Sequence, residues 1–170
     1  MHIRDIRPDE HQALGGLLVD VYSQLEGFPS PAEQPRYYAM LANIGTFTMR
    51  RDARVLVAVA PDGELWGGVV YFGDMSEYGS GGAATLERDA SGIRLLGVRP
   101  EVRGRGIGRA LSLACIELAR EKSHRCVVLH TTQPMRAAWA LYESLGFRRA
   151  PDLDFLQEAL PVFGFRLALR

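Results

Sequence analysis

The spacing of hydrophobic and polar residues predicts the first elements of the chain. Residues 3–7 alternate in character and stop at Pro8, which predicts a short strand. From Pro8 to about Gln24, acidic residues at the start and apolar residues at helical spacing predict a helix. Residues 27–31 are rich in glycine and proline and interrupt that pattern, so a second helix is expected over about residues 32–41.

Two apolar runs in the middle of the chain predict a hairpin. Residues 55–60 and 65–72 each read as a buried strand, and Pro61, Asp62 and Gly63 between them are typical of a turn. Residues 73–92 are long, polar and glycine-rich without a clear period. This segment is expected to be a loop, or a loop that hides a distorted strand extension.

The second half of the chain predicts strands and helices in turn. Apolar residues at helical spacing, a proline suited to a first helical turn and a glycine suited to a left-handed cap mark the two helices. The expected elements are a strand at 93–98, a helix at 107–122, a strand at 126–131, a helix at 134–146 and closing strands at 147–150 and 162–169. The chain has no repeat and no linker, so residues 1–170 are expected to form one domain.

Composition narrows the class of protein. The 170 residues are 47% hydrophobic and 24% charged, as in an ordinary globular protein, and 20 basic residues balance 20 acidic ones. No nucleic-acid or acidic-membrane partner is therefore expected. Cys115 and Cys126 lie in apolar segments without zinc-ligand spacing, which predicts reduced core residues and no metal site. The polar first residues and the lack of a long apolar run predict a cytoplasmic protein without a signal peptide or membrane span.

The segment VRPEVRGRGIGRAL, residues 98–111, carries the clearest candidate chemistry. It joins a predicted strand to a predicted helix, whose first N–H groups lack internal partners and lie at the positive end of the helix dipole. Glycines let such a backbone approach a phosphate closely. Arg103, Arg105 and Arg109 add positive charge, so a pyrophosphate is the expected ligand.

Other phosphate loops fit this segment poorly. Gly104, Gly106 and Gly108 do not follow the dinucleotide pattern G-x-G-x-x-G, and no Gly-Lys-Ser/Thr ending is present. A plain tight turn between strand and helix is the alternative without a ligand.

Two motifs together resemble the GNAT superfamily of N-acetyltransferases. Arg103, Gly106 and Gly108 match that family's acetyl-coenzyme A signature, Arg/Gln-x-x-Gly-x-Gly/Ala. The segment AAWALYESLGF matches its second signature at five positions, namely Ala138, Leu141, Tyr142, Gly146 and Phe147. Both stand in the family's order, one helix and one strand apart, and the resemblance covers roughly residues 55–147.

The resemblance implies an α/β fold with a mixed, mostly antiparallel central sheet. This sheet would have about six to seven strands, about four flanking helices and a splayed, V-shaped central cleft. The pantetheine arm of the coenzyme would enter between the strands at 93–98 and 126–131. Gly97 is expected where a close approach to the first of these strands is needed.

The implied activity is acetyl-CoA-dependent N-acetyl transfer, by direct attack of a primary amine in a ternary complex and without a metal. The implied coenzyme-binding residues are Leu96, Gly97 and Val98 on the strand, and Arg103, Gly104, Arg105, Gly106, Ile107, Gly108 and Arg109 at the loop. Tyr142 would protonate the leaving thiolate as the catalytic acid. The alternatives are a core role for Tyr142, a different acyl-CoA donor, and a non-catalytic acyl-CoA-binding module of the same fold.

Two departures from the family pattern concern the site. Met135 stands where relatives often have Asn, so the coenzyme contact of that Asn is expected to be lost or taken over by Thr132 or Gln133. The strand at 93–98 also lacks the carboxylate that serves many relatives as general base. The remaining candidates for the base are a water chain, an amine that arrives neutral, or a carboxylate among Glu26, Glu77, Glu87 and Asp89.

The acceptor is expected to be a small molecule or a peptide or protein amine. Four aromatic residues of the N-terminal helices are expected either to line its site or to pack in the core: Tyr22, Phe28, Tyr37 and Tyr38. The resemblance is also compatible with a homodimer that pairs through the C-terminal strands.

Overall fold

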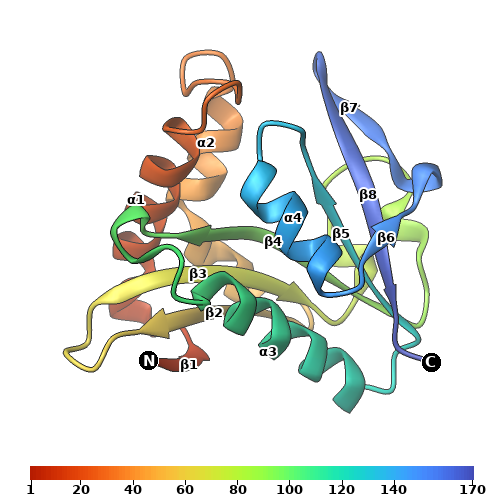
Figure 1. The fold of residues 1–170 in the computed structure, drawn as a ribbon, viewed down its shortest axis with the longest axis horizontal. Helices are drawn as coiled ribbons and strands as arrows, with labels where there is room; N and C mark the ends of the chain where they lie inside the picture. Colours follow the sequence, from red (N-terminus) through yellow and green to blue (C-terminus); the bar gives the residue numbers. More distant parts are fainter.

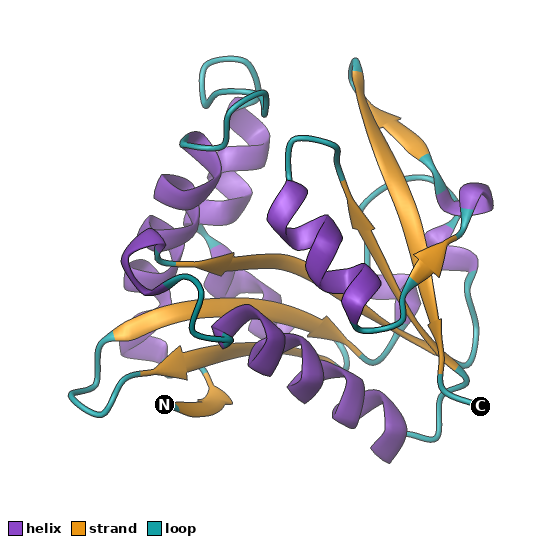
Figure 2. Ribbon diagram, viewed as in Figure 1, coloured by secondary structure: helices purple, strands orange, loops and turns teal.

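The computed structural model describes residues 1–170 and is built on one large sheet (Figures 1 and 2). Its strands are β1 (His2–Asp5), β2 (Ala53–Val59), β3 (Leu65–Phe72), β4 (Ala90–Val98), β5 (Cys126–Thr131), β6 (Arg148–Arg149), β7 (Phe155–Gln157) and β8 (Leu160–Ala168). Its α-helices are α1 (His11–Ser23), α2 (Pro35–Ala42), α3 (Ile107–Glu121) and α4 (Arg136–Ser144). No helix combines the length and the apolar character that a membrane crossing requires.

The sheet is mixed and mostly antiparallel, as expected. The strand order is β1-β2-β3-β4-β5-β8-β6, and β7 pairs with β8. Only β4 and β5 run parallel, because α3 crosses between them. The predicted hairpin of residues 55–60 and 65–72 is confirmed, since β2 and β3 pair antiparallel.

Helices cover both faces of the sheet, which explains why its central strands read as continuous apolar runs. Val55 and Val57 of β2 belong to a cluster of 24 buried residues that includes the buried side of α1 and α2. Leu56 and Ala58 point the other way, into a cluster of 16 buried residues under α3 and α4. In Figure 1, α3 and α4 lie on the near side of the sheet.

The expected splay beside β4 is confirmed. β4 and β5 pair only from Ala90↔Cys126 to Ile93↔Leu129, and no pairing continues toward Val98. Figure 1 shows the two strands diverging, with β4 running to the left and β5 toward the top. The register of β4 against β3 shifts at the same level, and Leu95 there has a left-handed φ of 61°. Non-glycine residues rarely adopt this conformation, so the backbone of β4 is strained where the strands part.

Some details of the structure differ from the predicted elements, and others agree with them. The sheet has eight strands rather than about six to seven, because residues 155–157 form β7, a short partner of β8. The distorted extension suspected in residues 73–92 is real, since β4 begins at Ala90. The fourth helix begins at Arg136 rather than at Pro134, which lies in the preceding turn. Cys115 and Cys126 are buried and free, as predicted.

The close approach at Gly97 has another cause than the one expected. A Cβ there would lie 2.5 Å from Cδ2 of Leu18 on α1. The missing side chain therefore lets α1 pack against β4, and Gly97 does not line the opening between β4 and β5.

Candidate active site

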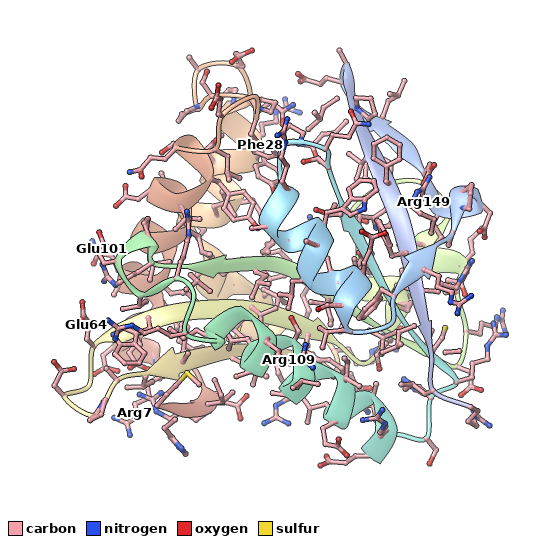
Figure 3. The ribbon with its side chains drawn as sticks, viewed as in Figure 1. Arg7, Phe28, Glu64, Glu101, Arg109 and Arg149 are labelled. Carbon is pink, nitrogen blue, oxygen red and sulfur yellow. The ribbon has the colours of Figure 1, made fainter.

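The glycine loop forms an open, positively charged start to α3. Gly106 caps the helix in a left-handed conformation with φ 78°, and Gly104 has φ 80°. A Cβ at either position would meet nothing within 4 Å, so the backbone there faces open space. The three arginines predicted to assist, Arg103, Arg105 and Arg109, are exposed and form no ion pair with a carboxylate. Figure 3 labels Arg109 on the first turn of α3.

A cavity runs from this loop along β4 to α4, and we call it the glycine-loop cavity. Eight of the ten residues predicted to bind the coenzyme line it: Leu96, Val98, Arg103, Gly104, Gly106, Ile107, Gly108 and Arg109. Its opposite walls are residues of α1 and α4, such as Val21 and Leu141. Gly97 and Arg105 are not part of the lining, and the Arg105 guanidinium lies 5.8 Å from the centre of the Trp66 ring.

A second cavity, which we call the aromatic cavity, lies on the other side of the opening between β4 and β5. Its walls carry six aromatic residues, a histidine and an arginine: Tyr22, Phe28, Tyr37, Tyr78, Tyr142, Phe155, His130 and Arg94. Three of the four aromatic residues predicted to line the acceptor site are among them. The fourth, Tyr38, is instead buried with its hydroxyl donating to the carbonyl of Pro29.

The two cavities meet at the point where β4 and β5 part. Tyr22, Leu96, Met135 and Ala138 line both of them. The Tyr22 hydroxyl donates to the Leu96 carbonyl at 2.8 Å and ties α1 to the strained part of β4. A ligand held along β4 from the glycine loop would therefore present its far end to the aromatic cavity.

Tyr142 of α4 lines the aromatic cavity one helical turn after Ala138, which lines both cavities. Its side chain is buried with 5% exposure, packs edge-on against Phe147 and lines the aromatic cavity, so its expected inward orientation is confirmed. The hydroxyl has no hydrogen-bond partner in the protein. Burial raises the pKa of the phenol above its ordinary value of 10, so Tyr142 stays protonated at neutral pH and can donate to a ligand.

His130 and Tyr78 form a hydrogen-bonded pair that sequence reasoning missed. His130 Nε2 lies 2.8 Å from the Leu153 carbonyl, which can only accept, so this nitrogen carries the proton. Nδ1 is then free to accept from the Tyr78 hydroxyl at 2.9 Å. Burial lowers the pKa of His130 below its ordinary value of 6.5, and the nearby Arg94 charge lowers it further. The imidazole is therefore neutral at pH 7.

None of the four carboxylates considered as general base lines the aromatic cavity. Glu87 pairs with Arg166 and Arg125, and Asp89 pairs with Arg170. Glu26 lies near the start of α4 on the outer surface. The backbone carbonyl of Glu77 accepts a hydrogen bond from Arg50, and its carboxylate forms no ion pair. The neutral imidazole of His130 is the basic group that this cavity contains.

Thr132 supplies an unpaired polar atom at the same place. Its side chain is 4% exposed, and Oγ1 has no hydrogen-bond partner. Buried hydroxyls nearly always have one, so an unpaired one in a cavity wall favours a bound group there. Met135 next to it caps α4 and accepts from the Thr131 hydroxyl through sulfur, which leaves Thr132 as the free donor beside β5.

Comparison with protein families agrees with this geometry. The model of the acetyltransferase (GNAT) family matches residues 18–147, which include β4, α3 and α4. The chain belongs to the GNAT family. The family assignment made from the two sequence motifs is thereby confirmed.

Relatives with curated descriptions share only part of their length with this GNAT protein. A mycothiol acetyltransferase of Arthrobacter sp. (strain FB24) is 34% identical over 97 residues, which cover 57% of this chain and 28% of that enzyme. The chain spans between 19% and 28% of the first curated relatives it matches.

Solved structures share the whole fold at low sequence identity. A GNAT-family acetyltransferase from Staphylococcus aureus Mu50 superposes with a TM-score of 0.76 at 16% identity, covering 99% of both chains. The PaiA N-acetyltransferase of Thermoplasma acidophilum, solved in complex with coenzyme A, has a TM-score of 0.73 at 16% identity, covering 98% of both chains. These likenesses show the GNAT fold, including its open sheet.

Proposed function

We propose that residues 1–170 form one acetyltransferase domain that transfers an acetyl group from acetyl-CoA to a primary amine by direct attack in a ternary complex. The observation that carries this proposal is the junction of the two cavities beneath Tyr142. One cavity begins at a helix start of the kind that binds phosphate, and the other contains the neutral imidazole of His130. Two substrates that enter from opposite sides would meet there, and their proximity alone would supply much of the rate.

The residues of the glycine-loop cavity fit the coenzyme. The N–H groups at the start of α3 and two arginines without a carboxylate partner, Arg103 and Arg109, suit a pyrophosphate. Leu96 and Val98 on the edge of β4 that β5 leaves unpaired would hold the pantetheine arm, and the free Thr132 hydroxyl just after β5 would replace the contact of the missing Asn. A β4 N–H group at the bulge would stabilise the oxyanion that forms when the amine attacks the thioester.

Tyr142 is proposed to donate its proton to the leaving thiolate. A free thiol has a pKa of about 8.5, lower than that of the buried phenol. The thiolate forms in the same dry cavity, where the loss of solvent raises its proton affinity as well. The hydroxyl has no protein partner to give up, so it can turn its hydrogen toward the sulfur without breaking a bond.

The Tyr78–His130 pair is proposed to accept the proton that the amine loses. Transfer from the amine to the Tyr78 oxygen, with the Tyr78 proton moving to His130 Nδ1, would leave an imidazolium whose Nε2–H still donates to the Leu153 carbonyl. Because the pKa of His130 is lowered, this acceptor is available at neutral pH and becomes protonated only in acid.

Replacement of His130 tests this proton path. We expect His130→Gln to lower kcat at pH 7 by at least roughly tenfold, in line with loss of general base catalysis. The acid limb of the wild-type kcat profile, which lies below pH 6.5, is expected to disappear in the variant. His124→Gln is the matched control, since His124 pairs with Ser91 outside the aromatic cavity. An unchanged kcat and profile in His130→Gln would remove this residue from the mechanism.

Acetyl transfer across a panel of amines tests the proposed function as a whole. The panel would hold amino acids, their amides, polyamines and short peptides, each mixed with acetyl-CoA and followed by release of free thiol and by the mass of the product. We expect at least one acceptor to gain 42 mass units, roughly the mass of an added acetyl group, in step with thiol release. Binding of acetyl-CoA without transfer to any class would instead support a non-catalytic acyl-CoA-binding module.

A further inference from the structure

Arg94 of β4 is a cation without an acidic partner in the wall of the aromatic cavity. Its side chain is partly buried, and Nη1 donates to the Tyr78 carbonyl at 2.9 Å. Nη2 has only the Met40 sulfur, a weak acceptor, at 3.7 Å. No ion pair joins Arg94 to any carboxylate, and no Asp or Glu lines this cavity.

A cation surrounded by aromatic rings normally has an acidic partner, and Arg94 has none. The guanidinium lies 5.7 Å from the centre of the Tyr78 ring and 5.9 Å from that of Phe47, so aromatic faces replace water around it. Burial lowers the pKa of Arg94 below its ordinary value. Buried charges are normally paired, and a guanidinium has five donors, of which two are used here.

The position of Arg94 indicates which kind of molecule could carry an anionic group to it. Arg94 lies two residues before Leu96 on β4, and both residues line the aromatic cavity, with Leu96 at its junction with the glycine-loop cavity. This closeness along β4 suits one small molecule whose amine reaches the junction while its anionic group reaches Arg94. The walls between them are aromatic and would contact its apolar part.

We propose that the acceptor is a small amine that also carries a carboxylate, an amino acid in the simplest case, and that Arg94 binds this carboxylate. The inference rests on the proposed acetyl transfer and names the substrate class for it. The planar guanidinium can donate two parallel hydrogen bonds to a carboxylate. An amine without a carboxylate has no group that accepts both. The aromatic walls favour amino acids with an apolar side chain.

Binding of the carboxylate would also assist the proton path. The Arg94 charge disfavours a proton on His130. A carboxylate paired with Arg94 offsets that charge, so His130 becomes a better proton acceptor when the correct substrate is bound. An acceptor without a carboxylate would supply no negative charge to offset the two cations of the transition state, Arg94 and the His130 imidazolium.

The test compares each amino acid with its own amide as acceptor. L-phenylalanine, L-leucine and L-methionine and the three corresponding amides are used with acetyl-CoA and a thiol readout. We expect wild type to prefer the acids by at least roughly thirtyfold in kcat/KM, as for a buried charge pair. Arg94→Met is expected to remove that preference while retaining slow transfer to the amides, and Arg94→Lys is expected to retain part of it.

Arg50→Met is the control for structural weakening. Arg50 also donates to a carbonyl of the 75–78 turn and lies over the Phe47 ring, but it does not line the aromatic cavity. Its variant is expected to keep the preference for acids. If amides react as well as acids in wild type, and Arg94→Met changes neither, the carboxylate proposal is wrong while acetyl transfer stands. If neither acids, amides nor other amines release thiol, the proposed function fails first and this proposal with it.

Discussion

Replacement of Tyr142 by phenylalanine is expected to lower kcat by roughly ten- to a thousandfold while affinity for acetyl-CoA stays nearly unchanged. The ring keeps its edge-on contact with Phe147 and its place in the cavity wall. The hydroxyl bonds to no protein group, so its removal breaks no internal hydrogen bond. Only the proton donor to the leaving thiolate is lost. Steady-state kinetics at saturating substrates and calorimetric titration with acetyl-CoA measure the two quantities separately.

A second buried tyrosine supplies the control. Tyr71 is equally buried and belongs to the same hydrophobic cluster, but its hydroxyl bonds to Ser91, and it lines neither cavity. Tyr71→Phe should leave kcat unchanged. An unaltered kcat in Tyr142→Phe at the pH optimum would return Tyr142 to the role of a core aromatic, and the thiolate would depart unprotonated or take its proton from water.

Gly108→Leu is expected to weaken acetyl-CoA binding by at least roughly a hundredfold, equivalent to about 2.8 kcal/mol. Gly108 lies in the first turn of α3 without a positive φ, so a side chain strains no backbone there. A Cβ would lie 3.4 Å from Leu141 and 3.8 Å from Leu96, on the floor of the glycine-loop cavity. The rest of a leucine side chain would fill the space proposed for the coenzyme. Gly106 is less suited to this test, because its φ of 78° penalises any side chain.

The matched control is Gly16→Leu. Gly16 is also a helical glycine, exposed on α1, and a Cβ there meets nothing within 4 Å. Both variants gain helix propensity, so circular dichroism and thermal unfolding should show both folded. Wild-type affinity in a folded Gly108→Leu protein would place the coenzyme elsewhere.

Local sequence patterns were sufficient for most of the fold. β3 and β5 have the predicted bounds, and α3 starts at the predicted residue, because each combines a clear apolar pattern with a nearby glycine or turn signal. β7 was missed because three residues carry too little pattern, and it forms only by pairing with β8. Gly97 was assigned the wrong neighbour because the packing of α1 against β4 depends on tertiary structure.

The two cavities of the candidate site also differ in how far the sequence predicts them. The glycine-loop cavity takes most of its lining from two short segments, residues 103–109 and 134–138, so the motif of the first segment could be read from the chain. The aromatic cavity joins α1, α2, β4, β5, β7 and the 75–78 turn, and no local pattern links His130 to Tyr78 or leaves Arg94 without an acid. The signal that was present, an arginine in the 93–98 strand and no carboxylate there, gains meaning only when its surroundings are known.

The crystal structure of the complex with acetyl-CoA tests the central claim most directly. The account predicts the pyrophosphate on the N–H groups at the start of α3 and the pantetheine arm between the parted ends of β4 and β5. The thioester sulfur should then lie within hydrogen-bonding distance of the Tyr142 hydroxyl, and the acetyl carbon should face the aromatic cavity. A coenzyme bound outside the glycine-loop cavity, or a thioester turned away from Tyr142, would contradict the account.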